Sequence, residues 1–278
     1  MKHQLEAKTV KTISPPSGWE RIDFRELWEY RDLFASLVVR DIKVMYAQTV
    51  LGFLWAILNP VVQIVMFTLV FGKIAKLYTD GIPYLLFVTV AVIPWSYMSH
   101  ALTASSQSLV TGQGMLGKVY FPRMLFPIAP ILSKMLDFLI SLVLIAIVMI
   151  YYQIAPNANF IYLPLFLLEM ILLPMAMGLW LSALAIRYRD VKFMLQFVIR
   201  MLMFTAPIVY SASTIPDVYR FLYSLNPLVS VIEGIRSSLL GLEMQWAFLI
   251  PGYIVTLVLL VTGALYFRRM ERTFADVI

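Results

Sequence analysis

The stretch VLGFLWAILNPVVQIVMFTLVF, residues 50–71, contains no charged side chain in 22 consecutive positions. A helix needs about 20 mostly apolar residues to cross the roughly 30 Å hydrocarbon core of a bilayer, so this stretch predicts a membrane-spanning helix. Across all 278 residues, 61% are hydrophobic, 14% are charged, and the mean hydropathy is +0.82. Soluble domains are about half apolar and about one quarter charged. The composition therefore indicates an integral membrane protein.

Outward from residues 50–71, further apolar runs have the length of a spanning helix: Ile82–Ala104, Leu125–Tyr152, Ile161–Ile186, Phe193–Ser211 and Ala247–Phe267. Between the last two runs, Ile215–Gly241 contains two shorter apolar pieces separated by Asn226-Pro227, and each is too short to cross the bilayer. We therefore predict an all-α membrane protein with six transmembrane helices and a re-entrant helical hairpin between spans five and six. The alternative is a seventh span in place of the hairpin, which would move the C-terminus to the other side.

The basic residues are distributed unevenly between the two sides of the membrane. Sixteen of the 22 Lys and Arg residues lie in the N-terminal segment, in the loops after spans two and four, and in the C-terminal tail. Because Lys and Arg favour the cytoplasmic side, we predict that both termini are cytoplasmic. Residues 1–49 would form a cytoplasmic N-terminal segment, residues 50–267 the membrane domain, and residues 268–278 a cytoplasmic tail. The +6 net charge is spread over these loops, which argues against nucleic acid as a partner.

Residues 29–45 have the pattern of an amphipathic helix. At 100° per residue, Arg40 and Lys43 fall opposite an apolar arc. Asp41 lies within that arc, where it can pair with Arg40, Lys43 or the start of a neighbouring helix. A helix of this kind beside a span is expected to lie in the cytoplasmic interface, in contact with membrane lipid. The apolar arc consists of Tyr30, Leu33, Phe34, Leu37, Val38, Val44 and Met45.

Groups for catalysis are scarce in this sequence. It contains no cysteine and two histidines, His3 and His100, and the loop acids are scattered singly. Gly112–Lys118 matches the first seven positions of the phosphate-binding pattern GxxxxGK[ST], but Val119 replaces the hydroxyl residue that would ligate magnesium. We therefore predict that this chain is not an enzyme and holds neither a cofactor nor a metal ion.

Ionisable residues within the apolar runs usually face protein or water, because a charge in lipid is costly. Lys134 and Asp137 are three residues apart on one helix face and are expected to pair. Glu169 and Arg200 either pack against a neighbouring helix or line a polar path for a substrate. Aromatic side chains such as Trp55, Trp95, Tyr97 and Tyr210 can stack on sugar rings, or they belong to the interfacial belt or the core.

Several short motifs, taken in order, resemble the permease subunits of polysaccharide ABC exporters, the type-2 ABC exporters of the O-antigen (Wzm-like), capsule and teichoic-acid group. The resemblance covers about residues 25–272. One departure is Met45, which stands where the family pattern predicts a basic residue for contact with a lipid phosphate. The motifs are RDIKVMYAQTVLGFLWAILNP at residues 40–60, Ile93-Pro94-Trp95, Tyr120–Arg123, Arg187–Asp190, Pro207–Tyr210, and Asn226-Pro227 followed by Arg236.

The resemblance implies a homodimer in the bacterial inner membrane that encloses a channel and works with two copies of a separate ABC ATPase, which binds ATP and magnesium. The implied substrate is an undecaprenyl-type lipid-linked glycan, with O-antigen the first choice. Capsular polysaccharide, teichoic acid, or a drug or lipid are alternatives within the class. An ion-coupled secondary transporter and a membrane-embedded transferase are alternatives outside it.

Three groups of residues are then expected to carry this function. The expected channel residues are Trp55, Gln63, Trp95, Tyr97, Arg200 and Tyr210. The expected ATPase-docking residues are Gly117, Lys118, Tyr120, Phe121, Arg123, Arg187, Arg189 and Asp190. Phe34, Arg40, Asp41 and Lys43 represent the interface helix.

Overall fold

The computed structural model describes residues 24–47, 49–116, 121–271 and 274. Throughout these residues the secondary structure is helical, and no strand occurs among them. Five helices are long and apolar enough to cross a membrane, so the chain is a multi-pass membrane protein. They are Gly52–Ile74 (η1 Gly52–Leu54, α3 Trp55–Phe67 and η2 Thr68–Ile74), α4 Tyr84–Thr111, α6 Leu125–Tyr151, Ala158–Arg187 (η3 Ala158–Tyr162 and α7 Leu163–Arg187), and α11 Trp246–Glu271.

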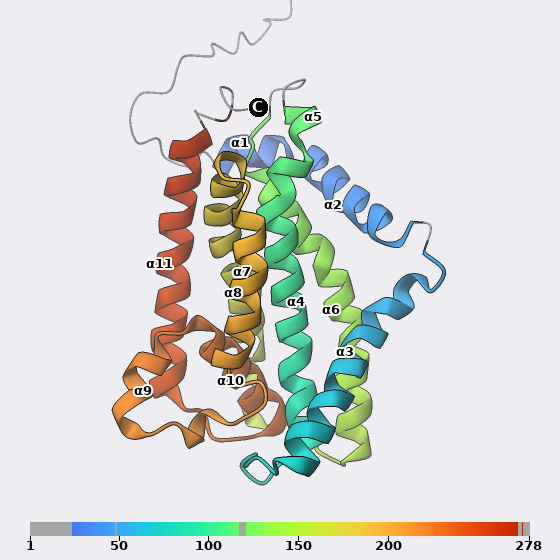
Figure 1. The fold of residues 1–278 in the computed structure, drawn as a ribbon, viewed down its shortest axis with the longest axis vertical. Coiled ribbons are helices and arrows are strands. Elements are labelled where there is room, and N and C mark those ends of the chain that lie inside the picture. The colour runs from blue at the N-terminus through green and yellow to red at the C-terminus, as the bar shows by residue number, and fades with distance from the viewer. Residues whose placement is uncertain (1–23, 48, 117–120, 272–273, 275–278) are drawn as a thin grey trace, which may run out of the picture.

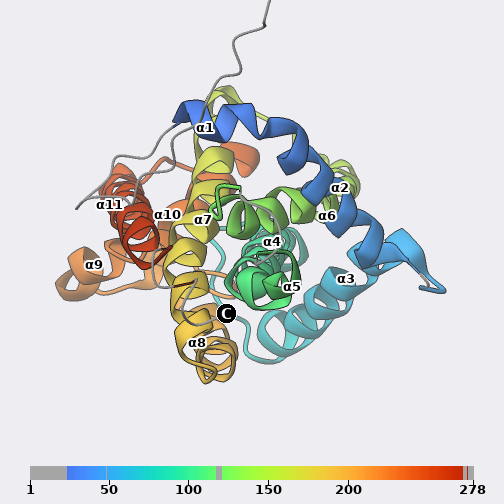
Figure 2. The same cartoon turned by 90° about the horizontal axis from the view of Figure 1, so that it is seen from above.

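Helix α4 lies at the centre of the bundle, with α6 and α7 packed along it (Figure 2). Its Ser and Thr hydroxyls find partners inside the protein: Thr89 Oγ1 donates to the Leu85 carbonyl at 2.6 Å, and Ser105 Oγ donates to the Pro127 carbonyl of α6 at 2.6 Å. Gly178 of α7 faces Ser105 so closely that a Cβ there would collide with the serine side chain. Small residues thus allow α4 and α7 to approach closely, as is common between membrane helices.

Two shorter helices, α1 (Phe24–Glu29) and α2 (Arg31–Tyr46), cross one end of the bundle, and α2 slopes toward the start of α3 (Figure 1). The predicted amphipathic helix is confirmed, because Leu37 is buried and Phe34 packs with it against a cluster that includes Phe126 and Phe267. Val44, at the end of the same apolar arc, is not covered by other helices. Val44 is 69% exposed because the last turn of α2 lies at the edge of the molecule, beyond the helices that cover the rest of its apolar arc.

The remaining helices are shorter than a span. Helix α8 (Val191–Thr205) covers only the first part of the predicted run Phe193–Ser211, and residues 206–211 are not helical. The predicted pair of short helices is confirmed as α9 (Asp217–Ser224) and α10 (Pro227–Leu240). Asn226 separates them, and its side chain accepts a hydrogen bond from the Leu228 amide at 3.1 Å, which caps α10.

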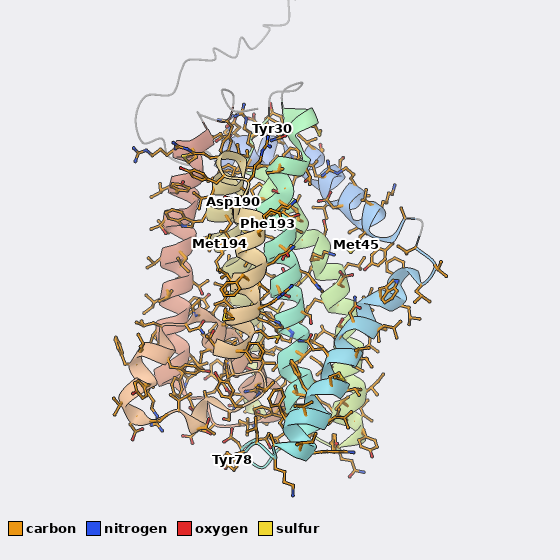
Figure 3. The ribbon with its side chains drawn as sticks, viewed as in Figure 1. Tyr30, Met45, Tyr78, Asp190, Phe193 and Met194 are labelled. Carbon is orange, nitrogen blue, oxygen red and sulfur yellow. The ribbon has the colours of Figure 1, made fainter. Side chains whose placement is uncertain are left out.

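The loops gather at two opposite ends of the bundle. One end carries α1, α5 (Gln113–Leu116) and the turn between α7 and α8 (Figure 1). At the other end, Asn159 Nδ2 of η3 donates to the Leu242 carbonyl at 2.8 Å and joins the start of the span Ala158–Arg187 to the loop before α11. The first will be called the α1 end and the second the α9 end. Figure 3 shows Tyr30 at the α1 end and Tyr78 at the α9 end.

Candidate transport path and docking surface

Helix α3 is the least buried of the long helices. In the most apolar 18-residue window of each helix, 11% of residues are buried in the span that contains α3, against 78% in α4. Its exposed side chains include Trp55, Val62, Val65 and Met66. No described residue covers these side chains, so the face is available to a second molecule or to the bilayer.

Helix α8 carries a second exposed face, on the same side of the molecule. Helices α3 and α8 flank α4 (Figure 2), and Gln63 Nε2 of α3 lies 3.4 Å from Met203 Sδ of α8. Arg200 is exposed at the edge of this apolar face, one turn beyond the exposed Gln196. Figure 3 shows Phe193 and Met194 in the part of α8 nearer the α1 end. The other large exposed residues of this face are Phe197, Met201 and Phe204.

Three further expected channel residues, Trp95, Tyr97 and Tyr210, contact other parts of the chain. Trp95 and Tyr97 are buried on α4, and the Tyr97 hydroxyl donates to the Ile131 carbonyl of α6 at 3.2 Å. The Tyr210 hydroxyl lies 3.3 Å from the carbonyl oxygens of Phe204 and Thr205 at the end of α8. The exposed faces of α3 and α8 therefore contain Trp55 and Arg200, with Gln63 at their junction.

A polar cavity of about 270 Å³ lies among α2, α3, α4 and α6. The predicted ion pair is confirmed on its wall, where Lys134 Nζ lies 3.4 Å from Asp137 Oδ2. The Tyr46 hydroxyl donates to Asp137, and burial, reinforced by that carboxylate, raises the pKa of Tyr46, so the hydroxyl stays a donor. Lys134 Nζ also lies 3.1 Å from Met45 Sδ, at the residue that Figure 3 shows at the end of α2. The cavity is further lined by Trp55, Asn59, Ser96, Tyr97 and His100.

The charged residues of α2 have local partners. Arg40 Nη2 lies 2.7 Å from Asp41 Oδ1, which is one of the pairings expected for Asp41. The Arg40 guanidinium also lies 5.9 Å from the centre of the Phe126 ring, at the edge of the range for a cation–π contact. Lys43 is exposed. Asp41 is thus tolerated in the apolar arc because Arg40 neutralises it.

The expected docking residues divide into two groups. Arg187, Arg189 and Asp190 are exposed in and beside the turn between α7 and α8, where Figure 3 shows Asp190. Phe121 is buried and stacks on Phe126, and Arg123 Nη1 donates to the Glu271 carbonyl of α11 at 2.9 Å. The second group therefore fastens the α1 end of the bundle internally. Gly117, Lys118 and Tyr120 lie outside the described residues.

Buried ionisable side chains on α10 and on the neighbouring α7 contact other helices. The sequence did not assign these contacts. The Glu169 carboxylate of α7 accepts hydrogen bonds from Ser230 Oγ at 2.7 Å and Thr256 Oγ1 at 3.1 Å, so it packs against neighbouring helices. Arg236, which the sequence placed in the predicted hairpin, is fully buried on α10 and pairs with Glu233. The spacing of three residues between Glu233 and Arg236 is the signal that could have revealed this pair.

The fold defines a class, the multi-pass α-helical membrane proteins. Comparison with known proteins gives the particular family. Residues 32–240 match the ABC-2 type transporter family, and the chain belongs to that family.

Similar proteins cover most of this chain. An O-antigen export system permease protein of Klebsiella pneumoniae is 23% identical over 248 residues, which is 89% of this chain and 95% of the relative. A protein of the same description from Myxococcus xanthus is 27% identical over 77% of this chain and 82% of the relative. A polysialic acid transport protein of Escherichia coli is 26% identical over 85% of this chain and 92% of the relative.

Proposed function

We propose that this chain is the membrane subunit of an ATP-driven exporter that moves a lipid-linked polysaccharide, foremost O-antigen, across the bacterial inner membrane. The observation that carries the proposal is the family match over residues 32–240. The descriptions of the relatives as O-antigen export permeases supply the cargo. The chain itself does no catalysis in this scheme, since a separate ABC ATPase binds ATP and magnesium and hydrolyses the nucleotide.

The proposed topology has six crossings, with both termini in the cytoplasm and the α1 end facing the ATPase. Helix α7 ends at the α1 end and α11 starts at the α9 end, so the intervening chain has to run the length of the bundle (Figure 1). Helix α8, with 15 residues, rises about 22 Å. The non-helical residues 206–211 then continue the chain from its end. Helices α9 and α10 then begin and end on the outer side, as a re-entrant hairpin would.

The proposed path runs along the exposed faces of α3 and α8 and is completed by a second copy of the chain. This dimer would cover two faces that the protomer leaves open, and it would bring Trp55 and Arg200 from both copies to the path. Indole rings stack on sugar faces, and a guanidinium donates hydrogen bonds to hydroxyl or acidic groups of a glycan.

The lipid-linked end of the substrate is proposed to enter at the cavity among α2, α3, α4 and α6. In the family pattern a basic residue is expected at the position of Met45, and Lys134 brings an ammonium group to within 3.1 Å of the Met45 sulfur. This cation, from a different helix, would serve the same lipid phosphate. Asp137 pairs with Lys134 at 3.4 Å, so the phosphate would have to compete with that carboxylate.

Docking of the ATPase is proposed at two cytoplasmic segments, the region from α5 to residue 123 and the turn with Arg187, Arg189 and Asp190. The second segment is exposed and charged, which suits a contact between two proteins. The internal bonds of Arg123 suggest that it fixes the first segment in position instead of touching the ATPase.

The test is co-expression of this chain with a candidate ABC ATPase in a strain that makes lipid-linked O-antigen but lacks its exporter. We expect a stable complex with two copies of each subunit, ATP hydrolysis, and surface O-antigen. A Walker-A lysine variant of the ATPase should abolish export while the complex still forms. Export that persists with this variant, driven by an ion gradient, would contradict the proposal and support a secondary transporter.

A capsular polysaccharide is a second candidate cargo, favoured by the similarity to a polysialic acid transport protein. The same strain design separates the two cargoes, because only one of the two polysaccharides is supplied at a time. Surface display of capsule but not of O-antigen would reverse the order of preference.

A further inference from the structure

Arg236 on α10 is a charged group at the α9 end that neither the proposed path nor the docking surface uses. It is 0% exposed, and its Nη1 donates to Glu233 Oε1 at 2.7 Å. Its guanidinium lies 3.7 Å from the centre of the Phe87 ring of α4, a close cation–π contact. Because a buried charge is costly unless it is paired and hydrogen-bonded, the partners of Arg236 indicate its role.

These partners include the backbone of the segment that follows α8, residues 206–216, here called the outer linker. Arg236 Nη2 donates to the Pro207 carbonyl at 2.6 Å, and the Ala212 amide donates to Glu233 Oε1 at 3.0 Å. The Tyr84 hydroxyl of α4 donates to the Val209 carbonyl at 2.9 Å. Side chains of α10 and α4 thus satisfy backbone groups of the outer linker, where only the short η4 (Ala212–Thr214) is helical and these groups would otherwise be buried without partners.

The outer linker is also tied to the loop that follows α3. Asp80, in the loop between η2 and α4, accepts a hydrogen bond from Ser213 Oγ at 2.8 Å and another from Ser211 Oγ. Asp80 therefore joins the chain just after α3 to the chain just after α8. These are the two helices whose exposed faces flank the proposed path.

We propose that Arg236, Glu233 and Asp80 form a latch that holds the outer ends of α3 and α8 together and keeps the outer mouth of the path closed. The inference rests on the proposed function, and it adds a means of control at the exit. Helix α8 continues directly into the latched backbone, so the mouth cannot widen until the outer linker is released. Arg236 is a positioning residue here, since it acts on the path through the outer linker.

One detail suits a latch that opens. Arg236 Nε has no hydrogen-bond partner among the described residues, so the guanidinium is held through its two Nη groups and the Phe87 ring. A fully satisfied polar network rigidifies a protein, whereas one with a missing bond is easier to rearrange. Release would require the Pro207 carbonyl to leave Nη2 and the Ala212 amide to leave Glu233, while the ion pair between Arg236 and Glu233 stays intact.

The experiment uses the full-length chain in membrane vesicles, and single cysteines serve as reporters because the natural sequence contains none. Ala206→Cys and Ala212→Cys place thiols at buried positions of the outer linker. Thr214→Cys is exposed and should react with a water-soluble maleimide in every background. Ala183→Cys, buried on α7 toward the α1 end, reports unfolding of the bundle.

With Arg236→Gln we expect the two outer-linker cysteines to react at least tenfold faster, while Ala183→Cys stays protected. Arg236→Lys keeps the charge beside Glu233 but loses the planar fork that reaches Pro207, so it should give an intermediate rate. The latch is overturned if the outer-linker cysteines stay unreactive in the Arg236→Gln chain while Ala183→Cys also stays unreactive.

If Ala183→Cys also becomes reactive in the Arg236→Gln chain, the variant has unfolded. Two milder variants, Tyr84→Phe and Asp80→Asn, then test the latch. Each removes hydrogen-bonding capacity at the outer linker without leaving Arg236 unpaired, and we expect a rise of about threefold in labelling, as for a weakened hydrogen bond. No rise in either variant would overturn the latch. Labelling requires no substrate, so it tests the latch independently of transport. If a variant shows faster labelling but exports at the wild-type rate with the ATPase, the latch exists but does not control transport.

Discussion

Helices α3 and α4 lie side by side, yet their environments differ. In their most apolar windows, 78% of α4 is buried inside the protomer but only 11% of the span containing α3. The more buried helix is also the less hydropathic of the two. Helix α4 includes hydroxyls such as those of Thr89 and Ser105 that bond to carbonyl oxygens, whereas α3 presents Val62, Val65 and Met66 outward.

This difference explains why the central helix α4 is less apolar than its exposed neighbour α3. A helix surrounded by other helices can carry small polar residues, because their hydroxyls find partners and their size allows close approach. A helix that faces lipid or an unfilled interface has no such partners and stays apolar. Of these two neighbouring helices, the more hydropathic one is thus the more exposed. The exposed faces of α3 and α8 are the ones that the proposed second copy would cover.

The largest effect is expected where α4 meets α7. Gly178→Val would push a side chain into Ser105, and overpacking at a site with no room should lower the free energy of unfolding by about 3 kcal/mol. Val62→Leu on the exposed face of α3 is the matched control and should change it by less than about 0.5 kcal/mol. Thermal unfolding of the purified protein in detergent measures both. Equal losses of unfolding free energy in the two variants would contradict the view that α4 is closely packed and α3 is not.

The next effect concerns transport. Phe197→Gln on the exposed face of α8 should leave protomer stability unchanged and lower export at least tenfold, because this face lines the proposed path. Val143→Gln, equally exposed but on α6, is the control and should export normally. Surface display of the polysaccharide is the measurement. Normal export by the Phe197 variant would move the path away from α8.

A smaller change is expected from the hydroxyl that joins α4 to α6. Ser105→Ala removes the 2.6 Å bond to the Pro127 carbonyl and should lower the free energy of unfolding by about 1 kcal/mol. Ser99→Ala removes a bond within α4 itself, to the Ser96 carbonyl, and should have about half that effect or less. A larger loss for the Ser99 variant in the same unfolding assay would mean that the bond between α4 and α6 does not stabilise the protein more than a bond within α4.

The smallest effect is expected at the junction of α3 and α8. Gln63→Leu removes a 3.4 Å contact to the Met203 sulfur, which is a weak acceptor, so the free energy of unfolding should change by no more than about 0.5 kcal/mol. Met203→Leu serves as the matched variant from the other side. A loss above about 2 kcal/mol in either would show that the protomer itself holds α3 firmly.

Much of the fold could be predicted from sequence. Uncharged runs such as Ile82–Ala104 identify spanning helices because length and hydropathy decide membrane insertion. The i,i+3 spacing of Lys134 and Asp137 correctly predicted an ion pair. The run Phe193–Ser211 was harder, because hydropathy does not show that Tyr210 folds back to cap the end of α8.

The candidate site could be predicted less well, because burial depends on which helices meet. Trp95 and Tyr97 had the residue types of a sugar-binding surface, yet α4 is the central helix and buries both. The sequence placed Arg236 within the predicted hairpin Ile215–Gly241 but did not show that its side chain is buried. Its partners at Pro207 and Phe87 are far away in sequence, so only the fold brings them together.

The most direct measurement is a comparison of water access along α8 and α6. Single cysteines at Met194, Phe197, Met201 and Phe204 of α8 are compared with cysteines at Leu139, Val143 and Ile147 of α6, all exposed on the protomer. A membrane-permeant maleimide reacts with a thiolate, which forms only where water reaches the thiol. In the complex with the ATPase, we predict labelling along α8 and none along α6. If the α8 positions are as unreactive as those of α6, both faces meet lipid, and the transport path does not run along α8.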